Sequence, residues 1–299
     1  MDAIDFEILK ILNKDSRRSF LTIGKELGIS GTAVRKKVEK MMDEGVIITF
    51  EVGFDSSLLQ LSTCIADIRL KGNFKTGEII AELKKIPTIL FVICAVGNIF
   101  TLMFYYHDSR ELEKIIERIH LINNVSNVET DIPRSHHFAD VKLSPLDWKI
   151  IHSLNHDARK KNHQIARELE VSPKTIKRRL NRLIKDRIIY FTIDVDLSRA
   201  KNYIMYVLAV ELETGVEKET VYARIKNEFS HIWATAGPVQ PSIAFFMYAD
   251  GLSEIGDVLE EVKRIPGVKK ADVFLYTSWH RFTEWYDKNI EKMARICPL

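Results

Sequence analysis

Near its beginning the chain reads IDFEILKILNKDSRRSFLTIGKELGIS over residues 4–30, and it reads LDWKIIHSLNHDARKKNHQIARELEVS over residues 146–172. An offset of 142 residues, which sets Asp5 on Asp147, aligns the two stretches without a gap. The residues of the first copy that the second copy repeats unchanged include Asp5, Ile8, Leu12, Asn13, Asp15, Arg17, Ile23, Leu27, Ser30 and Ile47. A repeat of this length indicates that one structural unit occurs twice, so we interpret the fold as two copies.

Each copy continues into a basic segment. In the second copy this segment reads SPKTIKRRLNRLIKDRII over residues 172–189, with seven cations against one acid. Its apolar residues follow the spacing of one helical stripe, and they are Ile176, Leu180, Leu183 and Ile184. Ser172 suits the N-cap and Pro173 suits the first helical position. The pattern therefore predicts a helix with one face in a core and a cationic face directed outward.

The first part of each copy predicts a helix-turn-helix. In the first copy, helical patterns occupy residues 2–13, 21–27 and 31–43. The short turns GIS and EVS precede the two basic helices, and a tight turn before a basic helix is typical of this motif. The strands that follow, VIITFEV and IIYFTIDV, predict a wing.

The second part of each copy predicts a ferredoxin-like β-α-β-β-α-β order. The strand and helix patterns of the first copy lie at 64–70, 79–86, 89–106 (two strands), 112–119 and 125–132. Those of the second copy lie at 203–212, 216–229, 232–235, 243–248, 253–265 and 268–276. The fold class is therefore α+β, and we expect the two sheets to pack face to face, because helices cover only one face of each.

Composition indicates the cellular compartment in which the protein is expected to act. The chain has 46% hydrophobic residues, a net charge of +3 and three cysteines that form no CxxC motif, which indicates a reducing, cytoplasmic compartment. Residues 86–106 carry no charge, but Gly97 and Asn98 form a turn signal at their centre. We interpret them as two buried strands and expect no membrane partner.

The repeated unit resembles the Lrp/AsnC family of archaeal and bacterial regulators. The resemblance rests on Ile4-Asp5, the LN.D.R of residues 12–17 and the IG.ELGIS of residues 23–30, and it covers nearly the whole chain twice. It implies winged helix-turn-helix domains at 1–53 and 144–196 and regulatory βαββαβ (RAM) domains at 60–133 and 202–277. The residues that follow, 278–299, are expected to form a helical tail because of their own apolar stripe. The resemblance also implies an archaeal, sequence-specific transcription regulator that forms a pseudo-dimer within one chain, a homodimer, or both.

Double-stranded DNA is the partner that the basic helices predict. The candidate DNA-binding residues are Ser30, Thr32, Arg35, Lys36, Lys37, Lys40, Ser172, Lys174, Thr175, Lys177, Arg178, Arg179 and Arg182. Residues at the start of such a helix meet base edges, and lysine and arginine contact phosphates. Cations are kept at all four positions that align 35, 36, 37 and 40 with the second copy.

The hairpin at which the family senses effectors usually reads Gly-x-x-Asp, but here the two copies read GNIF (97–100) and GPVQ (237–240). Because the acid is missing, we expect no common amino acid to bind there. An unknown small-molecule effector remains a candidate partner, with Gly97, Asn98, Gly237 and His231 as the residues around it.

The alternative is an enzyme, because siroheme decarboxylases resemble this family. Their HNY.R-like motif is missing from FVICAVGNIF and HIWATAGPVQ, so we expect no enzyme, no catalytic residue, no metal site and no cofactor. After the second sheet, residues 279–293 predict a further helix that docks on a regulatory domain or on a partner chain. Its stripe comprises Phe282, Trp285, Tyr286, Ile290 and Met293.

Overall fold

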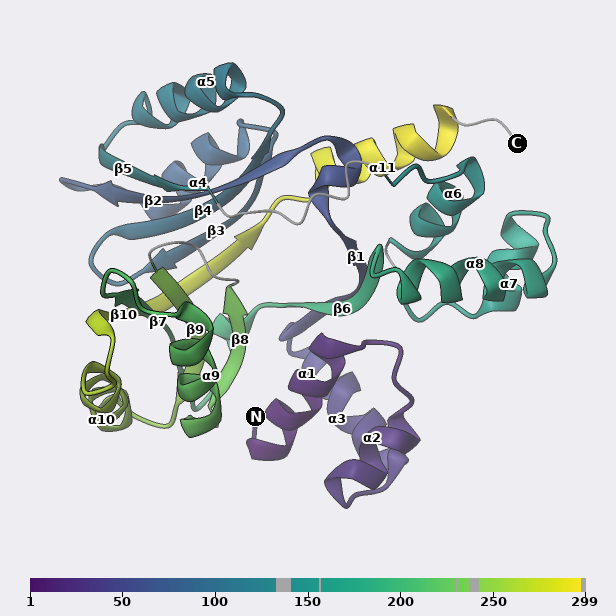
Figure 1. The fold of residues 1–299 in the computed structure, drawn as a ribbon, viewed down its shortest axis with the longest axis horizontal. Coiled ribbons are helices and arrows are strands. Elements are labelled where there is room, and N and C mark those ends of the chain that lie inside the picture. The colour runs from purple at the N-terminus through teal and green to yellow at the C-terminus, as the bar shows by residue number, and fades with distance from the viewer. Residues whose placement is uncertain (133–140, 156, 230, 237–241, 297–299) are drawn as a thin grey trace. The chain divides into compact units, whose positions relative to one another are not determined.

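The computed structural model describes residues 1–132, 141–155, 157–229, 231–236 and 242–296. They form two compact units, whose elements are labelled in Figure 1. The first, called the head unit here, comprises Met1–Ser62, Ser135–Arg199 and Thr283–Leu299. The second, called the sheet unit, comprises Thr63–Arg134 and Ala200–Phe282. Both units contain residues from both copies of the repeat.

The first copy contributes three helices to the head unit, which we call the first head. They are α1 (Ala3–Lys14), α2 (Phe20–Leu27) and α3 (Gly31–Asp43). Asp2, Ser19 and Ser30 cap them by accepting a hydrogen bond from a backbone N–H of the first turn. Gly28 ends α2 at a φ of 69°, a left-handed conformation that turns the chain into α3. The predicted helix-turn-helix is thus confirmed.

The second copy forms the second head in the same way. Its helices are α6 (Pro145–Leu154), α7 (Asn162–Glu168) and α8 (Pro173–Lys185). Ser144 and Ser172 cap α6 and α8. The predicted stripe of α8 is buried at three of its four positions, whereas Ile184 is 45% exposed. The core face of α8 is therefore narrower than its sequence predicts, and more of the helix surface faces outward.

The strands predicted as wings pair with each other instead. β1 (Ile47–Phe54) and β6 (Ile189–Val195) form a two-stranded antiparallel ribbon in which Glu51 lies opposite Thr192. Val52 and Phe54 of β1 belong to the core of the second head. Each strand satisfies its backbone with a strand of the other copy, so the wing prediction is corrected to a ribbon that joins the two heads. The short 3₁₀ helices η1 (Ser56–Leu59) and η2 (Leu197–Arg199) follow the two strands.

The tail forms α11 (Glu284–Ile296), which begins later than its sequence predicts because residues 268–281 belong to a strand. Ile290 is fully buried, and Tyr286 stacks on Phe54 with ring centroids 5.4 Å apart. Both side chains lie in the core formed by α6, α7 and α8. The tail therefore docks on the second head, and the predicted docking on a regulatory domain or a partner chain is corrected.

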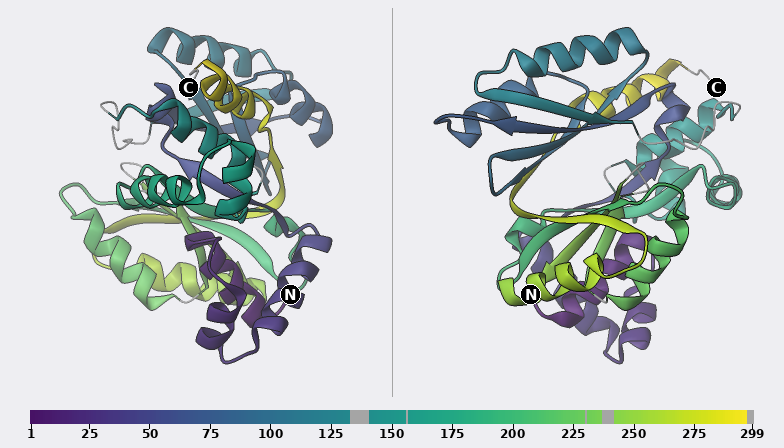
Figure 2. Two further views of the ribbon diagram at one scale, coloured as in Figure 1. Left: turned by 90° about the vertical axis from the view of Figure 1, so that its right-hand side faces the viewer. Right: turned by 60° about the vertical axis from the view of Figure 1, so that its left-hand side comes forward.

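The sheet unit contains both βαββαβ segments. The first has β2 (Ser62–Leu70), α4 (Thr76–Lys84), β3 (Ile89–Ala95), β4 (Ile99–Tyr106), α5 (Ser109–His120) and β5 (Val125–Asp131). The second has β7 (Ile204–Leu212), α9 (Lys218–Glu228), β8 (Ile232–Ala236), β9 (Ser242–Ala249), α10 (Leu252–Lys263) and β10 (Val268–Arg281). In each segment the two helices cover one face of the strands, as Figure 2 shows. The α+β class is confirmed.

One strand joins the two segments. The strand order is β5-β2-β4-β3-β10-β7-β9-β8, and β10 pairs antiparallel with β7 of its own copy and with β3 of the other. The sequence predicts that the two sheets pack face to face. The strand order shows that they are hydrogen-bonded edge to edge into one eight-stranded sheet. The long β10 pairs both edges that β3 and β7 would otherwise leave open. The uncharged residues 86–106 form β3 and β4, and no helix in the described ranges is long and apolar enough to cross a membrane.

Candidate nucleic-acid interface

The third helix of each head begins with a capping serine. The Ala33 N–H donates to Ser30 Oγ over 3.0 Å, and the Thr175 N–H donates to Ser172 Oγ over 3.1 Å. Thr175 Oγ1 also lies 2.9 Å from Ser172 Oγ. These three polar side chains therefore hold the helix starts. Thr32 and Lys174, each the second residue of its helix, are exposed.

Further along, exposed cations cover the outer side of both helices. In α3 they are Arg35, Lys36 and Lys40, and in α8 and the turn after it they are Lys177, Arg178, Lys185 and Arg187. Lys185 and Arg187 stand outside the set of site residues predicted from the sequence. Their exposure extends the cationic surface of α8 to its C-terminal end.

The remaining matched pair, Lys37 and Arg179, faces inward. Lys37 Nζ lies 2.6 Å from an Asp2 oxygen and 2.9 Å from an Asp5 oxygen. Burial disfavours the charge, but the hydrogen bonds to both carboxylates outweigh it and raise the pKa of Lys37. These contacts tie α3 to the start of α1.

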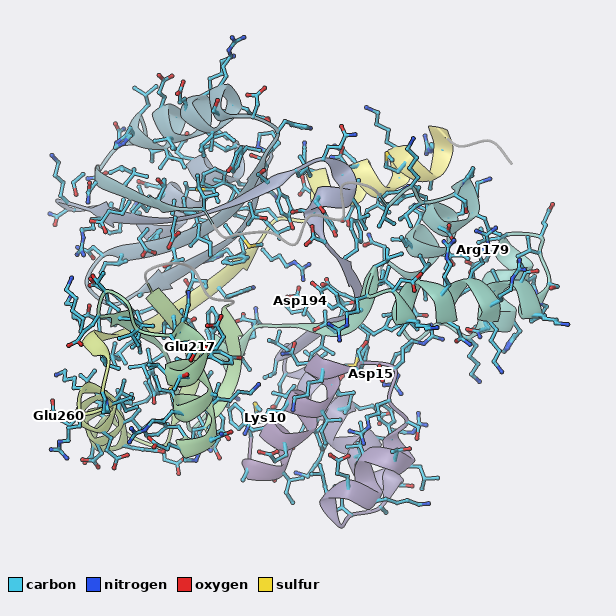
Figure 3. All side chains as sticks on the ribbon, in the orientation of Figure 1. Lys10, Asp15, Arg179, Asp194, Glu217 and Glu260 are labelled. Carbon is cyan, nitrogen blue, oxygen red and sulfur yellow. The ribbon has the colours of Figure 1, made fainter. Side chains whose placement is uncertain are left out.

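In the second head the same arrangement uses arginines. Arg179, labelled in Figure 3, donates to Ser144 Oγ over 2.9 Å and lies 3.3 Å from an Asp147 oxygen. Arg182 donates to the same carboxylate over 2.7 Å, although its side chain is 46% exposed. The Asp147 side chain is fully buried. Lys37, Arg179 and Arg182 therefore fix the third helices to the first ones, so they are not freely available cations.

Acids distinguish the two third helices. Glu39, Asp43 and Glu44 accompany the cations of α3. The aligned residues of the second head are Asn181, Lys185 and Asp186. Residues 157–187 hold eleven cations against four acids, a net charge of +7, whereas residues 15–45 hold seven against five, a net charge of +2. The second head therefore presents the stronger positive field.

Two arginines of the repeated LN.D.R motif connect the heads. Arg17 Nη2 donates to the Lys160 carbonyl over 3.0 Å, and Arg159 Nη2 donates to the Arg18 carbonyl over 3.2 Å. Lys160 aligns with Arg18, so the exchange is reciprocal. Arg159 Nη1 adds a bond of 2.6 Å to the Ser16 carbonyl. Burial lowers the pKa of both guanidiniums.

Each of these arginines also lies over an aromatic ring of the ribbon. The Arg17 guanidinium is 5.0 Å from the Phe191 ring centroid, and that of Arg159 is 5.2 Å from Phe50. The repeat marks both arginines in the sequence, but their role in pairing the heads depends on the β1–β6 ribbon, which the sequence does not predict.

The candidate effector residues lie in the sheet unit. Gly97 and Asn98 form the turn between β3 and β4, with φ values of 89° and 60°. His231 Nδ1 lies 2.7 Å from a Glu254 oxygen, just before β8 at the far edge of the sheet. β10, β7 and β9 separate β3 from β8, so the sheet order places these residues in different parts of the unit. Gly237 lies outside the described residues.

Comparisons with known proteins agree with this geometry. The AsnC-type helix-turn-helix domain matches residues 1–42 and 143–184. The HTH-type transcriptional regulator Ptr1 of Methanocaldococcus jannaschii is 30% identical over 135 residues, which are 44% of this chain and 90% of that protein. The regulator LysM of Sulfurisphaera tokodaii is 35% identical over 98 residues, which are 33% of this chain and 69% of that protein. Both matches span less than half of this chain, as is expected where a unit occurs twice.

A solved structure matches the whole tandem arrangement. The siroheme decarboxylase NirDL is similar over 97% of this chain and 98% of that chain, with a TM-score of 0.59 and 16% identity. At this level of identity the likeness shows a common fold alone.

Proposed function

Because the chain belongs to the Lrp/AsnC family of regulators, we propose that it is a transcription regulator that binds double-stranded DNA through α3 and α8. The observation that carries the proposal is the row of exposed cations on the outer side of both third helices. An α-helix fits the major groove of DNA, and lysine and arginine release counterions when they meet phosphates. A DNA-bound regulator of this kind acts in the cytoplasm.

The exposed residues divide by position. Thr32 and Lys174 stand near the helix starts, where base edges are met, and Arg35, Lys36, Lys177 and Arg178 follow one turn later. Lys37, Arg179 and Arg182 hold the helices in place. DNA binding through the third helices therefore rests on the exposed set, with the inward-facing cations as its support.

A salt titration tests the proposal. The double variant Lys177→Ala/Arg178→Ala removes two exposed cations of α8, and the matched control Lys288→Ala/Lys292→Ala removes two exposed cations of α11. Each lost phosphate contact flattens the slope of log K against log salt by about 0.9, so the α8 variant should lose roughly 1 to 2 units of slope. The control should keep the slope of the unmodified protein. Equal slopes for all three proteins would place the DNA elsewhere or exclude it.

We further infer that the sheet unit carries effector sensing and assembly. The Gly97–Asn98 turn offers no carboxylate to an α-ammonium group, so calorimetry with leucine or asparagine should show no binding in the micromolar range. Binding of either amino acid that is abolished by a substitution at Asn98 would contradict this.

The enzyme alternative has its own test, because the fold is shared with NirDL. When siroheme is added to the purified protein, the visible absorption bands of the siroheme should stay where they are for free siroheme in buffer. A shifted band together with loss of a carboxylate from the added tetrapyrrole would replace the regulator by a decarboxylase.

A further inference from the structure

The two heads are paired with approximate two-fold symmetry inside one chain. In the ribbon Phe50 lies opposite Ile193, and Phe191 lies opposite Val52, on either side of the Glu51–Thr192 pair. The exchanged arginines follow the same symmetry, since Arg159 lies over Phe50 while Arg17 lies over Phe191. α3 and α8 are therefore equivalent positions of a pair whose members have different sequences.

The side chains that these helices present outward differ at symmetry-related positions. The pairs are Thr32 and Lys174, Arg35 and Lys177, Lys36 and Arg178, Glu39 and Asn181, and Asp43 and Lys185. Lysine and arginine donate to the O6 and N7 acceptors of guanine, whereas glutamate accepts from the N4 amine of cytosine and the threonine methyl contacts thymine. The second helix presents donors at positions 174, 177 and 178, whereas the first presents donors at positions 35 and 36, an acceptor at position 39 and a methyl group at position 32.

The support of the third helix differs too. A Cβ on Gly24 would lie 2.6 Å from the Ile29 carbonyl oxygen, and a Cβ on Gly31 would lie 2.9 Å from the Leu21 Cα. The second head has Ala166 and Pro173 at these positions. Neither side chain fits the spacing of α2 and α3, so α7 and α8 must be spaced differently. The two reading helices thus differ in their side chains and in how they are held.

We propose that the two heads read unlike half-sites, so that the DNA site of this protein is not a palindrome. The half-site under α8 contains a guanine at the position that faces Lys174, while Lys177 and Arg178 contact phosphates as Arg35 and Lys36 do on α3. The half-site under α3 is mixed, with a cytosine facing Glu39. This inference rests on the proposed DNA binding and adds the asymmetry of the ligand.

Selection from a library of random duplexes tests the proposal with three variants. The first gives α3 the outward residues of α8, through Thr32→Lys, Arg35→Lys, Lys36→Arg and Glu39→Asn. The second is its reciprocal in α8, through Lys174→Thr, Lys177→Arg, Arg178→Lys and Asn181→Glu. The control places the same chemistry on exposed positions of α5, through Ser109→Lys, Arg110→Lys, Lys114→Arg and Glu117→Asn.

The unmodified chain and the α5 control should select one motif with two unlike halves. The first variant should select a motif whose α3 half shifts toward the inverted α8 half, and the reciprocal variant should shift in the other direction. The unmodified chain should bind its own motif at least about tenfold more tightly than a palindrome built from either half, since each mismatched base pair weakens binding roughly fivefold or more.

Other outcomes separate the inference from the function on which it rests. A palindrome selected by the unmodified chain, or unchanged motifs in both α3 and α8 variants, overturns the unlike half-sites and leaves DNA binding intact. DNA binding without any enriched motif would also overturn the unlike half-sites and leave the proposed DNA binding intact. No binding to any duplex removes the proposed function, and this inference with it.

Discussion

Glu170 stands in the turn before α8 with a φ of 54°, where the first head has Gly28 with a φ of 69°. This left-handed conformation is less stable by about 1–2 kcal/mol for a residue with a Cβ than the right-handed one. The second head therefore carries local backbone strain that the first head avoids.

Glu170→Gly should accordingly raise the free energy of unfolding of the head unit by about 0.5–1 kcal/mol, since part of the relief is offset by the greater flexibility of glycine in the unfolded chain. The matched control Gly28→Glu should lower it by about 1 kcal/mol. Denaturant titration of both variants is the measurement. A loss of stability in both would show that the Glu170 side chain holds the turn by contacts of its own.

Two adjacent arginines should behave in opposite ways. Arg179→Met leaves the buried Asp147 carboxylate with Arg182 as its remaining arginine partner, and should lower the free energy of unfolding by about 1–3 kcal/mol. Arg178→Ala should change it by less than about 0.5 kcal/mol, because Arg178 is exposed. Thermal unfolding and duplex affinity are measured on both proteins. The assignment fails if Arg178→Ala unfolds the protein while Arg179→Met affects only binding.

At the scale of elements, α8 should supply more of the electrostatic affinity than α3. Lys177→Ala/Arg178→Ala should flatten the salt slope more than Arg35→Ala/Lys36→Ala does, because Glu39 and Asp43 already weaken the field around α3. The two double variants are compared on one duplex over the same range of salt. A larger loss from the α3 variant would assign the stronger contact to the first head.

The docking of α11 on the second head should also be measurable. Ile290 is fully buried in that core, so Ile290→Ala should cost about 3 kcal/mol, unless α11 first detaches and limits the loss. Lys288→Ala, on the exposed side of the same helix, is the control. Hydrogen exchange of the α6 amides reports the effect. Unchanged protection in Ile290→Ala would mean that α11 does not support the second head.

The sequence predicts those elements well whose rules are local. The capping serines, the apolar stripes and the repeat place all six head helices, because caps and periodicity act within a few residues. The partners of β1, β10 and α11 cannot be predicted from the sequence. The alternation of side chains in β1 and β10 is the same whichever strand each one pairs with, and the apolar stripe of α11 does not show which core it enters. The candidate site is affected likewise, since the spacing of Lys37 and Arg179 does not show that both reach back to an aspartate of the first helix.

At the scale of the whole molecule, β10 should make the two βαββαβ segments unfold together. Leu208 is fully buried in β7, so Leu208→Ala should weaken amide protection in β3 and β4 as well as in its own segment. Hydrogen exchange monitored by mass spectrometry measures both segments at once. Arg110→Ala, on the exposed side of α5, is the control. Loss of protection confined to β7, β8 and β9 would show two independent halves.

The ribbon that pairs the heads has both of its strands in a single polypeptide. Regulators assembled from separate subunits dissociate on dilution, and a single subunit then lacks the second head that a paired site requires. Here the effective concentration of one head around its partner is on the order of millimolar, whatever the number of molecules in the cell. Pairing is thus uncoupled from expression level. A handful of copies would present the same two-headed surface as a thousand.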